Sequence, residues 1–140
     1  MATASALPQP GAAQPARSST VIALLRLEGL AVALLTAALY ARAGASWWLF
    51  AALWIAPDLS LLGYLASPCR GARIYNAFHT YLLPGLLALV ALLAHAQGLL
   101  IPIALIWANH IAIDRMLGYG LKYAEGFSYT HLGRIGKKNA

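Results

Sequence analysis

Charged residues are scarce in this chain. It has four acidic and ten basic side chains among 140 residues, or 10%, whereas about a quarter of the residues in an average soluble domain are charged. Hydrophobic residues make up 61%, so a soluble globular domain of this length would lack the polar surface that it needs. The net charge of +6 does not indicate nucleic-acid binding, because no basic stripe on a soluble face accompanies it.

Cysteine is almost absent as well. The single residue of this type, Cys69, excludes an intramolecular disulfide. A pair of cysteines at CxxC spacing, which would predict a zinc ribbon or a redox motif, is also lacking. We therefore interpret Cys69 as a reduced cytoplasmic thiol.

Long apolar runs, in contrast, dominate the sequence. Four of them approach the roughly 20 residues needed to cross a bilayer. The predicted spans cover about residues 21–41, 46–66, 72–96 and 98–121. The breaks between them are too short for anything but tight turns between antiparallel helices.

These runs predict an all-α integral membrane protein. Residues 21–121 would form a transmembrane four-helix bundle of antiparallel up-and-down spans. Residues 1–20, rich in Ala, Pro, Ser and Gln, are predicted to be a disordered cytoplasmic tail because they cannot bury a core. Residues 122–140 would form a cytoplasmic C-terminal tail.

Basic residues predict the orientation. With an even number of spans both termini share one side, and Arg42 is the basic residue of the opposite loops. The basic residues on the side of the termini are Arg17, Arg70, Arg73, Lys122, Arg134, Lys137 and Lys138. This asymmetry predicts that both termini are cytoplasmic.

Each predicted span also contains an ionisable side chain at a similar depth. At about 1.5 Å of rise per residue, these groups lie roughly 10–16 Å from the cytoplasmic surface. They are Glu28, Asp58, His79 and Asp114, with His110 one helical turn deeper than Asp114. An ionised residue at the centre of a membrane helix costs about 2.5–3.5 kcal/mol. We therefore expect all of them, Glu28 included, to turn inward and pair.

Two interpretations of this layer are open. In the first, the carboxylates are neutralised by Arg115 and by Arg26, as interhelical pairs that hold the bundle together. In the second, the layer is a metal site, since carboxylates and imidazoles are the ligands of divalent zinc, manganese or iron. His110 and Asp114, four residues apart, lie on one face of a helix and present two such ligands together.

The metal interpretation assigns a role to each residue. His79, His110 and Asp114 would bind the ion, and Asp58 would complete the ligand set or orient a histidine. Glu28 would act as general base toward water, so that Glu28 and Asp58 are the predicted catalytic residues. His131 would be a fifth ligand or part of a lid, because the chain after Asp114 is long enough to fold back.

Several segments resemble a known family in order along the chain. They are "LRLEGLAV", "WWLFAALWIAPDLSLLGYL", "YNAFHTYLLP", "HIAIDRMLGYGLKY" and "THLGRIG". Together they resemble the bacterial domain-of-unknown-function 4260 family, over residues 25–136. The resemblance implies an integral protein of the bacterial inner membrane and names no activity.

A weaker resemblance is to predicted inner-membrane metal-dependent hydrolases. The pairs Pro57-Asp58 and His79-Thr80, and the His110-to-Asp114 spacing, follow the pattern of that group in order. Ser60 stands where the pattern has a second aspartate, and a first histidine, near Ile74, is missing. The resemblance implies a metal site.

Two functions from different classes follow. The first is an intramembrane metalloenzyme that hydrolyses a lipid-like ester or phosphoester, reached from the bilayer. The alternative is a non-enzymatic small membrane protein, either an ion or proton carrier or an assembly partner, whose buried charges form an interhelical salt-bridge network. Four short spans make a thin bundle, which favours a homodimer in both cases.

Overall fold

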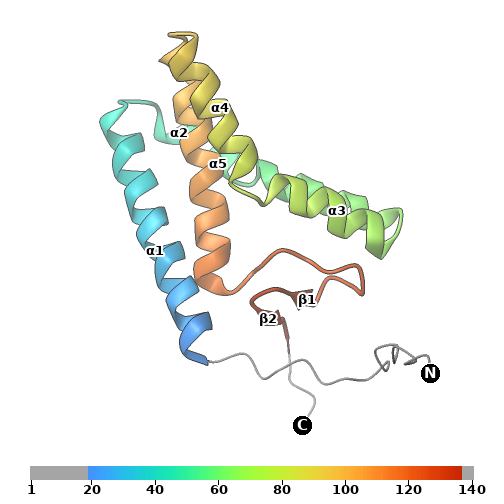
Figure 1. The fold of residues 1–140 in the computed structure, drawn as a ribbon. Helices are drawn as coiled ribbons and strands as arrows, with labels where there is room; N and C mark the ends of the chain where they lie inside the picture. The colour runs from blue at the N-terminus through green and yellow to red at the C-terminus, as the bar shows by residue number, and fades with distance from the viewer. Residues whose placement is uncertain (1–18, 137–140) are drawn as a thin grey trace, which may run out of the picture.

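The computed structural model describes residues 19–136 (Figure 1). Within these residues the elements are α1 (Ser19–Arg42), α2 (Trp47–Trp54), the 3-10 helix η1 (Ala56–Leu65), α3 (Pro68–Phe78), α4 (Leu82–Leu93), α5 (Gln97–Leu117), β1 (Tyr129–Thr130) and β2 (Gly133–Arg134). The predicted tail of residues 1–20 lies outside the described residues except for its last two, which begin α1.

Four helical stretches are long and apolar enough to cross a membrane. They are Ser19–Arg42, Trp47–Leu65, Pro68–Leu93 and Gly98–Leu117. They match the predicted spans in number and order, and the predicted all-helical character of the apolar region is confirmed.

Helix α1 packs on α5 through a row of small side chains. Its buried residues are Gly29, Ala33, Thr36 and Tyr40, which follow one another by three or four positions and so share one face. At Gly29 the two backbones are close, because a Cβ atom added there would lie 2.7 Å from the backbone nitrogen of Met116. Small residues at such a crossing are typical of membrane helix pairs.

The buried side-chain amide of Asn109 connects α5 to both α1 and α2. The Asn109 side chain on α5 donates to the Ala33 carbonyl at 2.8 Å and to Thr36 Oγ1 at 3.0 Å, both on α1. Its Oδ1 accepts a hydrogen bond of 3.1 Å from Trp54 Nε1 on α2. These bonds fix the rotation of α5, and therefore the direction in which its next residue, His110, points.

The second candidate span is broken in the middle. Pro57 has no N–H to donate to the carbonyl of Leu53, which favours a break in the α-helix at this point, although Pro102 is accommodated inside α5. Instead, the Asp58 N–H donates to the Ile55 carbonyl at 3.0 Å, and the chain continues as the 3-10 helix η1. This break, expected from Pro57, places Asp58 at the start of η1.

The third candidate span breaks in the same way. Helix α3 ends at Phe78 and α4 begins at Leu82. Pro84 cannot donate to the Thr80 carbonyl, and its ring would collide with that carbonyl in a continuous helix. His79 caps the C-terminus of α3 at this break.

Helices η1 and α3 pack on one another and form an arm, the name used below for these two helices. The arm extends to one side of α1, α4 and α5, which run alongside each other (Figure 1). This arrangement differs from the straight up-and-down bundle predicted from the sequence, because two of the four spans bend at their prolines.

After α5 the chain folds back under the arm. Gly118 ends α5 with a φ of +95°, a conformation that favours glycine. The Asn76 side chain on α3 then pairs with the backbone of Lys122, accepting from its N–H at 2.7 Å and donating to its carbonyl at 2.8 Å. Strands β1 and β2 form a short antiparallel hairpin, and Leu132 between them is buried.

Candidate metal centre

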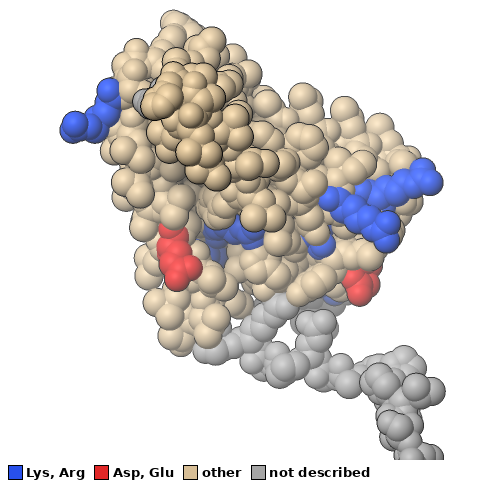
Figure 2. Space-filling view, turned by 45° about the horizontal axis from the view of Figure 1, so that its top comes forward, with Lys and Arg blue, Asp and Glu red and all other residues tan. Residues whose placement is uncertain are grey.

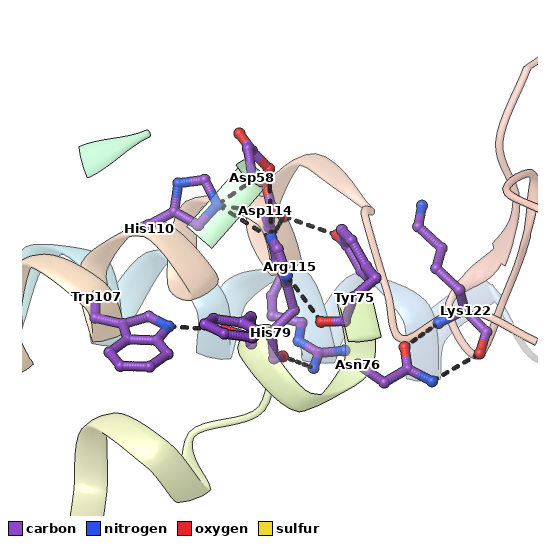
Figure 3. Close-up of polar contacts among 10 residues, drawn as sticks. Asp58, Tyr75, Asn76, His79, Trp107, His110, Asp114, Arg115 and Lys122 are labelled. Atoms are coloured by element: carbon purple, nitrogen blue, oxygen red, sulfur yellow. Dashed lines mark hydrogen bonds and ion pairs between the residues drawn. The ribbon is translucent and has the colours of Figure 1, made fainter. Parts of the chain in front are cut away.

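Four ionisable side chains meet where the two broken spans approach α5 (Figure 3). Asp58 comes from the start of η1, His79 from the end of α3, and His110 and Asp114 from α5. One donor atom from each lies within 4.8 Å of all the others. This group could hold a metal ion.

The separations among these donor atoms are short and similar. The two histidine Nε2 atoms are 3.2 Å apart. His79 Nε2 lies 3.4 Å from Asp58 Oδ1 and 3.6 Å from Asp114 Oδ2. His110 Nε2 lies 3.5 Å and 3.9 Å from the same two oxygens. Both imidazoles therefore point their Nε2 atoms at one point between two carboxylates.

The broken backbone at His79 is held by side chains from α5. The last carbonyls of a helix lack intrahelical donors. Here the Phe78 carbonyl accepts a hydrogen bond of 2.7 Å from Trp107 Nε1, and the His79 carbonyl accepts one of 3.0 Å from the Arg115 guanidinium. These two bonds fix the end of α3 against the helix that supplies the other histidine.

Tyr75 supports two of the four residues at once. Its carbonyl lies 3.0 Å from His79 Nδ1, and its ring stacks on the His79 ring with centroids 3.7 Å apart. Its hydroxyl donates to Asp114 Oδ2 at 3.0 Å. Sequence reasoning missed Tyr75, although its position four residues before His79 places the two side chains on one helix face.

The histidines are buried and the carboxylates are partly open. His79 and His110 are 2% and 1% exposed, whereas the Asp58 and Asp114 side chains are 34% and 17% exposed. The carboxylates face a pocket of about 220 Å³, the carboxylate pocket, lined by Asp58, Leu61, Tyr75, Asp114, Tyr119 and Phe127. Solutes can therefore approach the cluster from the carboxylate side.

A second hollow lies beside the cluster and is apolar. This apolar pocket, of about 200 Å³, is lined by Leu53, Ala56, Pro57, Phe78, Ile103, Ile106 and Trp107. Pro57 and Phe78 directly precede Asp58 and His79 in the chain. The cluster thus lies next to a polar hollow and an apolar one.

The comparison with protein families decides the classification. A family model described as "Domain of unknown function (DUF4260)" matches residues 22–135, which include all four residues of the cluster. The chain belongs to the DUF4260 family. No curated protein and no solved structure is significantly similar to the chain, so the activity of this family domain must be argued from its site.

Glu28 lies outside the cluster of the DUF4260 domain. The expectation that it turns inward is wrong: Gly29 takes the face of α1 that meets α5, and Glu28, the neighbouring residue, is exposed. Consecutive helical residues point about 100° apart, so Glu28 lies to one side of the face on which Gly29 packs against α5. Glu28 lines a separate hollow together with Arg115 and His131.

Arg115 does not pair with Asp114. Besides its hydrogen bond to the His79 carbonyl, its Nη1 atom lies 2.8 Å from His131 Nε2. His131 Nδ1 accepts the Leu121 N–H at 2.8 Å. Over residues 19–136, the side-chain ion pairs run between the two aspartates and the two histidines of the cluster. Arg115 therefore contacts the C-terminal segment, and the four-residue cluster could hold a metal ion or form a salt-bridge network.

Proposed function

We propose that Asp58, His79, His110 and Asp114 bind one divalent metal ion, and that this centre hydrolyses a lipid-like ester or phosphoester. The observation that supports the proposal most strongly is the convergence of four metal-donor atoms from three helical segments on one point. Bundle proteins build metal sites from facing helices in this way.

The donor separations fit a tetrahedral ion. Ligands at about 2.0–2.2 Å from a tetrahedral zinc ion are about 3.3–3.6 Å apart. Ligands at adjacent corners of an octahedral magnesium site would be only about 2.9–3.0 Å apart. Five separations in the cluster are 3.2, 3.4, 3.5, 3.6 and 3.9 Å, which favours zinc over magnesium. Two imidazoles and two carboxylates are also ligands that manganese and iron accept.

Hydrogen bonds account for only part of the same geometry. The two histidine Nε2 atoms, 3.2 Å apart, can share one hydrogen bond. An N–H···O bond, however, spans about 2.7–3.2 Å, and all four histidine–carboxylate distances exceed that range. The Tyr75 carbonyl can accept only from a protonated His79 Nδ1, which leaves a lone pair on Nε2 of the neutral ring. That lone pair faces His110 Nε2 and two carboxylates, and a cation at their centre would satisfy all of them.

Exposure suggests a division of roles among the ligands. The buried histidines and Asp114 would hold the ion throughout, while Asp58, the most exposed of the four ligands, would give up its place to the attacking water and accept a proton from it. A divalent ion supplies Lewis acidity and makes water easier to deprotonate. We assign no step to Glu28, because it is exposed on α1 away from the cluster.

The hydrolysis is balanced without any further reactant. Water forms a new bond to the carbonyl carbon or phosphorus, and the bond from that atom to the alcohol oxygen breaks. The proton that Asp58 accepts from water then goes to the departing alcohol, so that the carboxylate is restored. Asp58 can exchange this proton through the carboxylate pocket, which it lines.

The apolar pocket supports a lipid-like substrate. All of its lining side chains are hydrocarbon apart from the indole N–H of Trp107. That N–H already donates to the Phe78 carbonyl. A hydrocarbon chain could occupy this hollow while its ester group reaches the cluster beside Pro57 and Phe78. Residues of three candidate membrane spans line the hollow, so in a bilayer lipids would be its neighbours.

Tyr75→Phe is expected to lower zinc affinity by about 10-fold or more, because losing a group that orients a ligand typically costs about 10–100-fold. The variant removes the hydrogen bond to Asp114 and retains the ring that stacks on His79. Zinc competition with a chromogenic chelator measures the change. Tyr129→Phe, in the exposed hairpin, is the matched control and should bind zinc like the wild type.

We also propose that both termini face the cytoplasm of the bacterial inner membrane, as the asymmetry of basic residues indicates. Figure 2 shows a face that is mostly uncharged, with positive charge at the far end of the arm, where α3 has Arg70 and Arg73. In a Cys69→Ala background, cysteines at Ala43 and Ala96 should react with an impermeant reagent from outside, and one at Ala124 should not. The reverse pattern would contradict this orientation. The predicted homodimer stays a prediction.

Elemental analysis of the purified full chain tests the metal proposal. We expect one zinc ion per chain, lost on treatment with a strong chelator and regained on reloading. Hydrolysis of short-chain lipid esters or phosphoesters should disappear and return with the metal. A folded protein that stays metal-free after incubation with zinc, manganese and iron would overturn the proposal.

A further inference from the structure

Lys122 is a buried cation beside the candidate metal centre. It is 3% exposed, and among the described residues its Nζ atom is one of the few buried polar side-chain atoms without a hydrogen-bond partner. Its neighbours are aromatic: Nζ lies 3.9 Å from the ring centre of Phe127, 5.0 Å from that of Tyr75 and 5.6 Å from that of Tyr119. Cation–π contacts offset only part of the cost of burying an ammonium group.

The three rings around Lys122 also line the carboxylate pocket. The ammonium group is therefore next to the pocket through which solutes reach Asp58 and Asp114. Its backbone is fixed to α3 by both hydrogen bonds of the Asn76 amide (Figure 3). Burial lowers the pKa of Lys122 to about 8, an effect that the nearby Asp114 partly opposes, so the side chain is still mainly a cation at pH 7.

Counting charges shows what this cation would add. A divalent ion bound by the carboxylates of Asp58 and Asp114 and by two neutral imidazoles has a net charge of zero. Lys122 brings the site to +1. Arg115 adds a further positive charge, but its guanidinium already donates to the His79 carbonyl and lies 2.8 Å from His131 Nε2. The metal-loaded pocket would thus attract an anion, and Lys122 is the cation with no bonded partner to give up.

We propose that the substrate of this site contains a phosphate ester, and that the Lys122 ammonium determines this specificity by binding a charged phosphate oxygen. The proposal rests on the metal centre proposed above and narrows its substrate class. A carboxylic ester is neutral and would leave the ammonium unpaired, whereas a phosphoester keeps a negative oxygen before and after hydrolysis. Lysine binds phosphate as a compact point charge.

Calorimetric titration of the zinc-loaded full chain with inorganic phosphate tests this role. Lys122→Met should weaken phosphate binding at least tenfold, while zinc remains at one ion per chain. Lys122→Arg should keep most of the affinity, because it keeps the charge. Arg134→Met is the matched control, since Arg134 also lies over an aromatic ring, Tyr129, at 5.1 Å, but is exposed. Its phosphate affinity should stay within twofold of the wild type.

A lipid headgroup and a free phosphate share this chemistry, and a second titration distinguishes them. Dihexanoyl phosphatidic acid binding more tightly than inorganic phosphate assigns a lipid substrate. Equal affinities assign a soluble phosphoester. Dihexanoylglycerol, which has the chains and no phosphate, should bind equally well to the wild type and to Lys122→Met.

Nuclear magnetic resonance follows Lys122 without replacing it. The chain has three lysines, Lys122, Lys137 and Lys138, so the double variant Lys137→Arg/Lys138→Arg leaves Lys122 as the single source of a lysine ¹³Cε signal. In the zinc-loaded protein this signal should shift as phosphate is added, and the shift should saturate.

Each result decides between the two proposals. A zinc-loaded chain whose Lys122 signal does not move at high phosphate, or whose phosphate affinity is the same in Lys122→Met, overturns the role of Lys122 and leaves the metal centre standing. A chain that binds no zinc overturns the metal centre, and the role of Lys122 with it.

Discussion

Asp114→Asn is expected to lower zinc affinity by more than about 100-fold, because removing a ligand should exceed the effect of removing a group that only orients one. Asparagine has the same shape and can still accept the Tyr75 hydrogen bond, so the helices should remain folded. Metal analysis after dialysis measures the loss. Zinc at 1,000 times its dissociation constant should stabilise the wild type by about 4 kcal/mol, and this gain should vanish in the variant.

Glu28→Gln is the matched control for that substitution. It makes the same carboxylate-to-amide change on an exposed residue outside the cluster, so it should retain one zinc ion per chain. If Asp114 instead served as the partner of Arg115, the double variant Asp114→Asn/Arg115→Met would recover the stability that Asp114→Asn loses. The contacts of Arg115 with His131 and the His79 carbonyl predict no such recovery.

Gly29→Val is expected to destabilise the protein by about 3 kcal/mol, the upper end of the usual cost of overpacking a tight interface. A Cβ atom at this position would lie 2.7 Å from Met116 N and 2.9 Å from the Ala112 carbonyl oxygen. Both are backbone atoms, so α1 must move away from α5. Unfolding in a detergent–SDS titration measures the free-energy change.

Gly85→Val provides the comparison. Gly85 is also helical, in α4, but a Cβ atom there would meet nothing within 4 Å. Its substitution should change the free energy of unfolding by less than about 1 kcal/mol, which is roughly the difference in helix propensity between these residue types. Equal losses for Gly29→Val and Gly85→Val would contradict the close packing of α1 on α5.

The sequence predicted most members of the cluster but not all of them. Helical rise placed one ionisable side chain of each span at a similar position, and Asp58, His79, His110 and Asp114 do meet. Which face of α1 turns inward depends on its neighbours. The spacing of Gly29, Ala33 and Thr36 was the available signal, and it would have turned Glu28 away from α5.

The positions of the two breaks could be read from the sequence, but the geometry that follows from them could not. Pro57 indicates the first break. Pro84 indicates the second, since its missing N–H affects the carbonyl of Thr80, the residue after His79. The direction in which the arm leaves α5 could not be read from the sequence. It depends on the contacts of Trp107 and Arg115 with the end of α3, and residues so distant in sequence have no local signature.

The C-terminal segment shows the same limit. The length of chain after Asp114 indicated that it could fold back, and Gly118 does end the helix. The pairing of Asn76 with Lys122 joins residues 46 positions apart, and no periodicity connects them. For this reason the sequence analysis used Lys122 only as one of the basic residues that predict the orientation. Its position beside the cluster is visible only in the folded chain.

X-ray absorption at the zinc edge of the loaded full-length protein tests the central claim most directly. The four-residue centre predicts about four nitrogen and oxygen neighbours at about 2.0–2.1 Å, with two imidazole rings visible in the outer shells. The His79→Gln/His110→Gln variant should lose the imidazole signal. A sulfur neighbour at about 2.3 Å, which would come from Cys69, or a spectrum unchanged in the double variant, would contradict the assignment.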